Sequence, residues 1–208
     1  APEEARATPG AAYLHVTLNN TIEGSQWNGL PETGGVPLVG DVTSCLLGRR
    51  LDLSKFSLVY AGAQKNLGPA GVTAVIAKES LLAGAGEELP LIFRYATYLK
   101  NDSLYNTPPV HSVYMMNLVL RWTERQGGVA ALERTNAAKA KRLYDAIDRS
   151  GGFYVGAVEE AARSMMNVTW RISDPKLENR FLAMAAENGF EGLAGHRSVG
   201  GMRASLYN

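Results

Sequence analysis

The sequence lacks the features of a disulfide scaffold, a zinc module or a membrane protein. Its 208 residues contain one cysteine, Cys45, which excludes an internal disulfide and a CxxC metal or redox site. Such sparse cysteine use is typical of a reducing compartment, so we expect a cytoplasmic setting. No apolar stretch approaches the roughly 18 residues that a membrane-spanning helix needs, and we expect no membrane partner.

The chain also lacks an excess of charge of either sign. Lys and Arg number 21 and Asp and Glu number 20, a formal net charge of +1. This balance gives no basic field for a polyanion, so we expect no nucleic-acid partner. Hydrophobic residues make up 46% and charged residues 20%, which is typical of a globular protein with one large or two small domains.

The first half of the chain has the pattern of a buried α/β sheet. Its apolar runs are short and almost continuous, which is typical of strands covered on both faces. Clusters of Gly, Pro, Asn and Asp separate these runs and indicate turns. The predicted strands are 12–17, 36–40, 56–60 and 72–77.

The second half changes to helical spacing followed by a small α+β layer. Glycine pairs end the two long helices, as glycine commonly does past a helix C-terminus. We therefore divide the chain into a sheet domain, 1–128, and a second domain, 129–208, that opens with a connecting helix. The predicted helices are 110–126, 129–149 and 177–188, and the predicted strands are 152–158, 166–172 and 200–207.

A lysine in a loop of small residues is the first indication of chemistry. Lys65 lies in the run YAGAQKNLGPAG, between two predicted strands. Such a loop places an amine at the carboxyl end of a sheet, where α/β proteins form ligand sites. Partial desolvation makes a lysine amine a better nucleophile. The alternative is a solvated lysine in a turn, and the spacing leaves both interpretations open.

Asp41 is the second candidate, because it follows the predicted strand before that of Lys65. Two adjacent strand ends bring an aspartate and a lysine to the same edge of a sheet. A carboxylate there can hold a pyridine nitrogen protonated through a charge-assisted hydrogen bond, which makes the ring an electron sink. The alternative is a side chain that shapes a turn.

Six ordered segments resemble one family. The run YAGAQKNLGPAG (60–71) resembles the Schiff-base lysine segment of the phosphoserine aminotransferases, which belong to the class V group of pyridoxal-phosphate aminotransferases. The similarity extends along nearly the whole chain in the family's order and spacing. The other segments are LNNTIEG (18–24), LVGDVTS (38–44), LDLSKF (51–56), SLYNTPP (103–109) and GHRSVGGMRASLYN (195–208).

The resemblance implies a fold, a cofactor and the residues that hold it. The implied α/β fold is part of the large-domain sheet of the type I pyridoxal-phosphate transferases, followed by a smaller α+β C-terminal domain. The implied cofactor is pyridoxal 5′-phosphate. Lys65 would form the Schiff base and move the substrate α-proton, and Asp41 would pair with the pyridinium nitrogen. Thr21 would bond near the phenolic oxygen, and Gln64 would contact the phosphate.

The resemblance also implies a homodimer and a substrate pocket. Asn106 and Thr107 would reach the phosphate of the cofactor in the neighbouring subunit. Arg203 would clamp the substrate α-carboxylate with its planar fork. His196 and Arg197 would bind the distal anion of phosphoserine or glutamate. Each of these side chains also has an ordinary interpretation as a surface or turn residue.

The implied activity transfers an amino group between glutamate and 3-phosphohydroxypyruvate, giving O-phosphoserine and 2-oxoglutarate in serine biosynthesis. We expect a fragment, because the family's N-terminal glycine-rich loop, stacking aromatic residue and C-terminal helix have no counterpart in these residues. One alternative is a non-catalytic fragment. Another is a class V aminotransferase for an unphosphorylated amino acid, which the His196–Arg197 pair disfavours.

Overall fold

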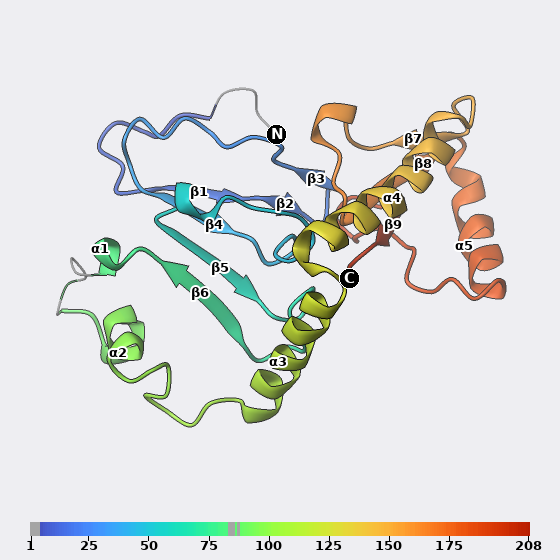
Figure 1. The fold of residues 1–208 in the computed structure, drawn as a ribbon. Coiled ribbons are helices and arrows are strands. Elements are labelled where there is room, and N and C mark those ends of the chain that lie inside the picture. Colours follow the sequence, from blue (N-terminus) through green and yellow to red (C-terminus); the bar gives the residue numbers. More distant parts are fainter. Residues whose placement is uncertain (1–4, 83–85, 87) are drawn as a thin grey trace.

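A four-stranded mixed sheet forms the first part of the computed structural model, which describes residues 5–82, 86 and 88–208 (Figure 1). Its strand order is β1-β4-β5-β6; the first three strands are parallel, and β6 runs antiparallel to β5. The strands are β1 (Leu14–Thr17), β4 (Leu38–Asp41), β5 (Leu58–Gly62) and β6 (Thr73–Ala77), and a small hairpin, β2 (Asn19–Asn20) and β3 (Ser25–Gln26), follows β1.

The apolar runs that predicted these strands do form a core, with one exception. Val16, Leu38 and Val59 are buried together from three neighbouring strands. On β6, however, Val75 and Ile76 are 40% and 48% exposed. The expectation that every strand of this sheet is covered on both faces is therefore wrong for β6, which forms one edge of the described sheet.

Helices lead from this sheet to the second part of the molecule. The turn between the two longest contains Gly127, whose φ of +94° is a conformation that favours glycine. Both long helices begin and end within a residue of their predicted bounds. The helices are α1 (Glu79–Leu82), α2 (Tyr95–Lys100), α3 (Val110–Arg125) and α4 (Gly128–Asp148), with short 3₁₀ helices at η1 (Leu53–Lys55) and η2 (Leu91–Phe93).

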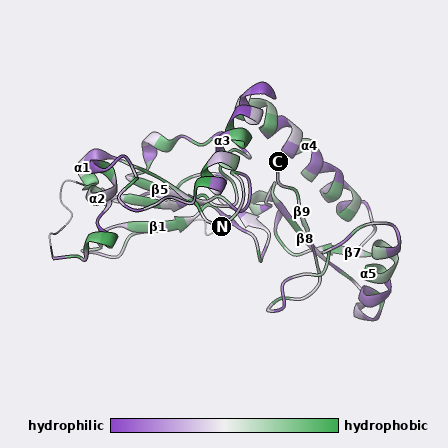
Figure 2. Ribbon diagram, turned by 90° about the horizontal axis from the view of Figure 1, so that it is seen from below, coloured by the Kyte–Doolittle hydropathy of each residue, from purple (hydrophilic) through white to green (hydrophobic). Residues whose placement is uncertain are grey.

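The second part is a three-stranded antiparallel sheet with α4 and α5 beside it (Figures 1 and 2). Val168, Trp170 and Met202 are buried between the sheet and these helices. The division of the chain at residue 128 stays a prediction. The elements are β7 (Tyr154–Gly156), η3 (Glu160–Ala162), β8 (Asn167–Ile172), η4 (Pro175–Leu177), α5 (Glu178–Glu187) and β9 (Met202–Ser205).

The β2–β3 hairpin lies directly against the second sheet. Thr169 Oγ1 donates to the carbonyl of Glu23 at 2.7 Å. Gly24 has a φ of +79°, and a Cβ there would lie 2.8 Å from the carbonyl oxygen of Asn167. Only glycine permits this approach, so the hairpin brings β8 and β9 to the carboxyl ends of β1 and β4.

Within the described ranges, no helix is both long and apolar enough to cross a membrane.

Candidate active site

A cavity of about 300 Å³ lies where the parallel strands end. Parallel strands leave a sheet at the same edge, and ligand sites of open α/β sheets form there. Four residues predicted to bind the cofactor line this cavity together: Thr21, Asp41, Gln64 and Lys65. Residues 17, 19, 20, 22, 23, 43 and 44 complete the lining.

Asp41 is the last residue of β4 and lies between β1 and β5. It pairs in register with Thr17 on one side and with Tyr60 on the other. Its Oδ1 accepts a hydrogen bond from the backbone N–H of Thr43 at 2.9 Å, so the carboxylate also shapes the turn after the strand. Burial and the negative charge of Asp41 raise the pKa of Tyr60. The carboxylate therefore has a fixed place on the cavity wall.

Lys65 is half-buried and has a side-chain partner. Its Nζ donates to the hydroxyl of Tyr207 at 3.2 Å and lies 5.4 Å from the centre of that ring. This contact disfavours the alternative of a lysine held only by solvent. The neighbouring Gln64 is exposed, and a Cβ on Gly62 would collide with its side-chain amide. Glycine at that position leaves room for the amide beside the cavity.

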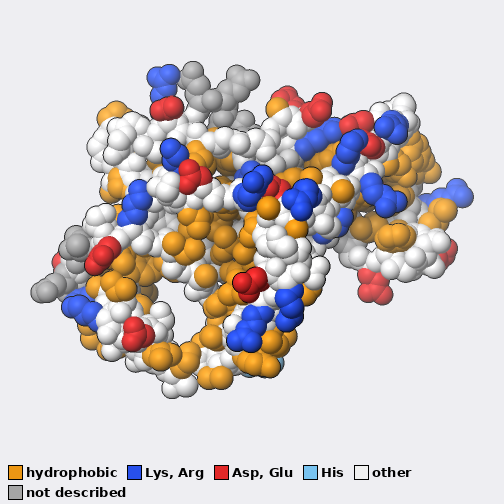
Figure 3. Space-filling view, in the orientation of Figure 1, with side chains coloured by type: hydrophobic (Ala, Val, Ile, Leu, Met, Phe, Trp, Pro, Cys, Tyr) orange, Lys and Arg blue, Asp and Glu red, His pale blue; other side chains and the backbone are white. Residues whose placement is uncertain are grey.

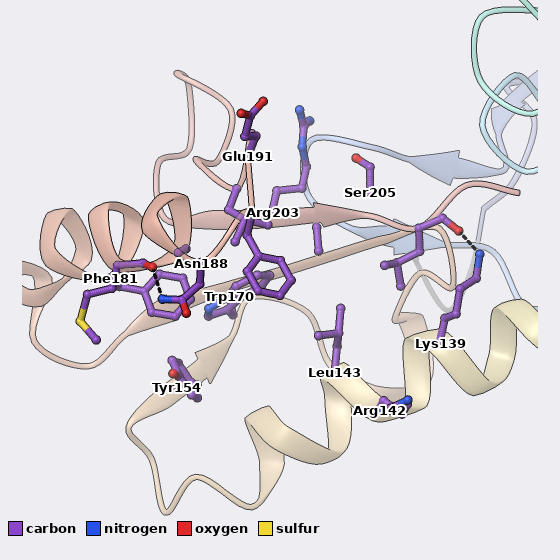
Figure 4. A pocket seen from close by; sticks show the side chains of 17 residues that line it. Lys139, Arg142, Leu143, Tyr154, Trp170, Phe181, Asn188, Glu191, Arg203 and Ser205 are labelled. Atoms are coloured by element: carbon purple, nitrogen blue, oxygen red, sulfur yellow. Dashed lines mark hydrogen bonds between the residues drawn. The ribbon is translucent and has the colours of Figure 1, made fainter.

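Arg203 connects the second sheet to the cavity. It lies on β9, and its Nη1 donates to the backbone carbonyl of Thr21 at 2.8 Å. Figure 4 shows its side chain directed away from Leu143 and Phe181, two residues of an apolar groove of about 910 Å³ between α4, α5 and the second sheet. Arg203 lines this groove and not the Lys65 cavity, and its hydrogen bond to the Thr21 carbonyl is its link to the cavity wall.

His196 and Arg197 do not line the Lys65 cavity. They lie in the turn before β9, where His196 Nδ1 is 2.8 Å from the hydroxyl of Ser198 and Arg197 is exposed. A Cβ on Gly195 would collide with the carbonyl of Gly200, so the turn is tightly closed. The assignment of this pair to the distal anion stays a prediction.

Asn106 and Thr107 do not line the cavity either. Both are exposed in the segment that joins α2 to α3, and the Nδ2 of Asn106 donates to the carbonyl of Thr107 at 3.2 Å. That segment passes beyond β6 at the far edge of the first sheet (Figure 1). Their role at another subunit's cofactor stays a prediction.

The structure adds a buried polar cluster that the sequence did not predict. Asn19 Nδ2 donates to Ser44 Oγ at 2.8 Å and to Asn167 Oδ1 at 2.9 Å. Ser164 Oγ donates to Asn19 Oδ1, and Asn167 also contacts Tyr207. Up to 148 positions separate these partners in the sequence, so no local pattern could have indicated them.

Comparison with known proteins identifies the family to which this fold and this lysine–aspartate cavity belong. The family model "Aminotransferase class-V" matches residues 2–208, and the chain belongs to this family. The phosphoserine aminotransferase of Niallia circulans is 54% identical over 206 residues, which are 99% of this chain and 57% of that protein.

Solved structures agree with this assignment. The phosphoserine aminotransferase from Bacillus circulans subsp. alkalophilus has a TM-score of 0.93 at 54% identity, over 97% of this chain and 56% of that one. A second structure, described as radiation damage of the Schiff base in phosphoserine aminotransferase, has a TM-score of 0.92 at 52% identity, over 97% and 56% of the two chains. This chain thus spans little more than half the length of the relatives that it matches.

Proposed function

We propose that the protein containing these 208 residues is a pyridoxal-phosphate-dependent phosphoserine aminotransferase. It would exchange an amino group between glutamate and 3-phosphohydroxypyruvate, giving O-phosphoserine and 2-oxoglutarate, as a step of serine biosynthesis. One observation carries the proposal: Lys65, Asp41, Thr21 and Gln64 line one cavity, in a chain 54% identical to a phosphoserine aminotransferase.

The residues of the cavity fit pyridoxal phosphate. The half-buried amine of Lys65 suits the aldehyde, and the carboxylate of Asp41 suits a protonated pyridine nitrogen. Thr21 offers a hydroxyl for the phenolic oxygen, and the amide of Gln64 offers donors for the phosphate. Bound there, the cofactor supplies an electron sink for a carbanion at the substrate α-carbon.

The protein's own residues would bind the substrate and move its proton. Lys65 would move the proton between the substrate α-carbon and the C4′ carbon of the cofactor, which requires its amine to stay within reach of both atoms. Arg203 would hold the α-carboxylate, and its hydrogen bond to the carbonyl of Thr21, a residue of the cavity wall, supports this assignment. We assign the distal phosphate or carboxylate to His196 and Arg197.

We further propose a homodimer in which Asn106 and Thr107 of one copy reach the cofactor of the other. Their exposure, and their position away from the cavity of their own chain, support this arrangement.

We place the protein in the cytoplasm. Cys45, the one cysteine of these 208 residues, is a buried free thiol, and burial raises the pKa of that thiol to about 11.

An absorbance titration tests cofactor binding. We expect pyridoxal phosphate to give a visible band that is lost in Lys65→Ala, because that variant lacks the amine. Asp41→Asn should keep the amine but weaken binding roughly tenfold or more, since it removes a charge-assisted hydrogen bond. Lys55→Ala, which removes an exposed amine, is the matched control. A band that persists in Lys65→Ala contradicts the assigned role of this lysine.

A substrate comparison separates the alternative functions. Conversion of phosphoserine but not alanine to its keto acid, in the protein that contains this chain, supports the proposal. Preference for alanine instead indicates a class V aminotransferase for an unphosphorylated amino acid. Cofactor binding by the isolated 208-residue chain without conversion of any amino acid indicates a non-catalytic fragment.

A further inference from the structure

The Lys65 amine has a partner from the segment that follows the second sheet. Tyr207 follows β9, 142 positions after Lys65, and its hydroxyl accepts a hydrogen bond from Nζ at 3.2 Å. The aromatic ring lies 5.4 Å from the same nitrogen, within the range of a cation–π contact. The hydroxyl and the ring of Tyr207 therefore both contact this amine, and Tyr207 is not among the residues that line the cavity.

A buried amide fixes the hydroxyl of Tyr207. Asn167 Nδ2 donates to that hydroxyl at 3.2 Å, and its Oδ1 lies 3.4 Å away as an acceptor for the hydroxyl proton. Asn167 itself is fully buried. With its proton directed to Asn167, the hydroxyl is left to accept from Lys65.

The position of Asn167 is set by the cluster beneath the cavity. Its Oδ1 accepts from Asn19, which is 2% exposed and bonded in turn to Ser44 and Ser164. Asn19 and Ser44 also line the cavity. Buried polar side chains whose bonds are satisfied in this way hold a defined geometry. The chain of contacts thus connects the cavity floor to the lysine amine through Tyr207.

We propose that Tyr207 is a positioning residue for Lys65. Its hydroxyl, oriented by Asn167, holds the amine at the cavity edge whenever the amine is free, so that the amine points toward the cavity and not toward solvent. This inference rests on the proposed function, in which Lys65 must alternately bond to the cofactor and act as a free amine. It adds a residue that is not among those lining the cavity.

Two reaction rates of the Lys65 amine test the proposal in Tyr207→Phe, a variant that keeps the ring and loses the hydroxyl. We expect one rate to rise and the other to fall. The first is acetylation of Lys65 by a small neutral reagent in the cofactor-free protein, measured by peptide mass spectrometry relative to the exposed Lys55. An amine released from its hydroxyl should react roughly two- to tenfold faster, the range that one net hydrogen bond supports.

The second rate is the appearance of the Lys65-dependent visible band at saturating pyridoxal phosphate. It should fall by a similar factor, because a released amine samples directions away from the cavity. A general loosening of the fold would instead lower the melting temperature. Tyr13→Phe, at an exposed tyrosine, is the control and should change neither rate.

Asn167→Ala should reproduce both changes and add little to Tyr207→Phe, because Asn167 acts through the hydroxyl. If Asn167→Ala fails to fold, the comparison of Tyr207→Phe with Tyr13→Phe decides. Equal rates in those two variants overturn the proposal. Absence of any Lys65-dependent band in the wild-type protein would instead count against the proposed function, and the acetylation ratio would still decide the role of Tyr207.

Discussion

At the scale of single residues, the pairing of side chains with distant partners sets the chemistry. Lys65 and Asp41 could be predicted as candidates, because Asp41 ends a recognisable strand and Lys65 lies in the loop that follows the next one. Their partners could not. The Asp41 carboxylate is bonded to the adjacent turn, whereas Lys65 is held by Tyr207 from the far end of the chain. Periodicity says which face of an element is apolar, but it contains no information on which polar groups meet.

Tyr144 allows a prediction for alkaline pH. Its hydroxyl donates to the carbonyl of Ser164 at 2.9 Å, Arg163 lies over its ring at 4.6 Å, and burial raises its pKa to about 12. The folded state therefore keeps a proton that the unfolded chain loses near pH 10. The resulting stability is fully present below pH 10 and is lost as pH rises through about 12.

Urea unfolding of the wild type and of Tyr144→Phe, at pH 8 and at pH 11, measures this effect. At pH 8 we expect the variant to be about 1 kcal/mol less stable, because it lacks one buried hydrogen bond. At pH 11 the difference in free energy of unfolding should be smaller, because only the wild type has a hydroxyl that folding must keep protonated. A difference that is constant or grows with pH contradicts the assignment.

At the scale of elements, the sequence predicted the long helices well, because three to four residues per turn leave an apolar stripe. On α4 that stripe is interrupted by Asn136, which the pattern alone cannot explain. The structure gives the reason: Asn136 is 1% exposed, and its Nδ2 donates to the carbonyl of Gly48 at 2.9 Å and to Asn208 Oδ1 at 2.7 Å. One amide thus joins α4 to the turn at Gly48, after β4, and to the segment after β9.

Asn136→Ala should therefore destabilise the protein more than its place on a helix suggests. It leaves the buried Gly48 carbonyl without this donor, at a cost of about 1–3 kcal/mol. Thr135→Ala, one position along and exposed, is the control, because its hydroxyl bonds only to its own helix. The free energies of unfolding in urea should differ clearly between the two variants. Similar values would show that Asn136 does not join the two parts.

At the scale of the whole molecule, exposed apolar side chains are concentrated on one side. They lie on β6, on η2 and α2, and along α3, and Figure 3 shows them gathered in the lower part of the view. Patches of this extent usually mark contact with other protein. The segment between α2 and α3 also carries Asn106 and Thr107, which we assign to the cofactor of a neighbouring subunit. The exposed members include Ile76, Ile92, Phe93, Leu99, Leu104, Val110 and Tyr114.

We therefore expect this 208-residue chain to associate in a concentration-dependent way, through the apolar side that includes Phe93. Sedimentation should show complexes that dissociate on dilution, and Phe93→Ser with Ile92→Ser should weaken them, because these side chains are 70% and 61% exposed. Val155→Ser, which removes a 48% exposed valine from β7 on the other sheet, should leave association unchanged. A chain that stays monomeric at all concentrations, or that responds equally to Val155→Ser, would place the contact elsewhere and remove the support that this surface gives to the proposed dimer.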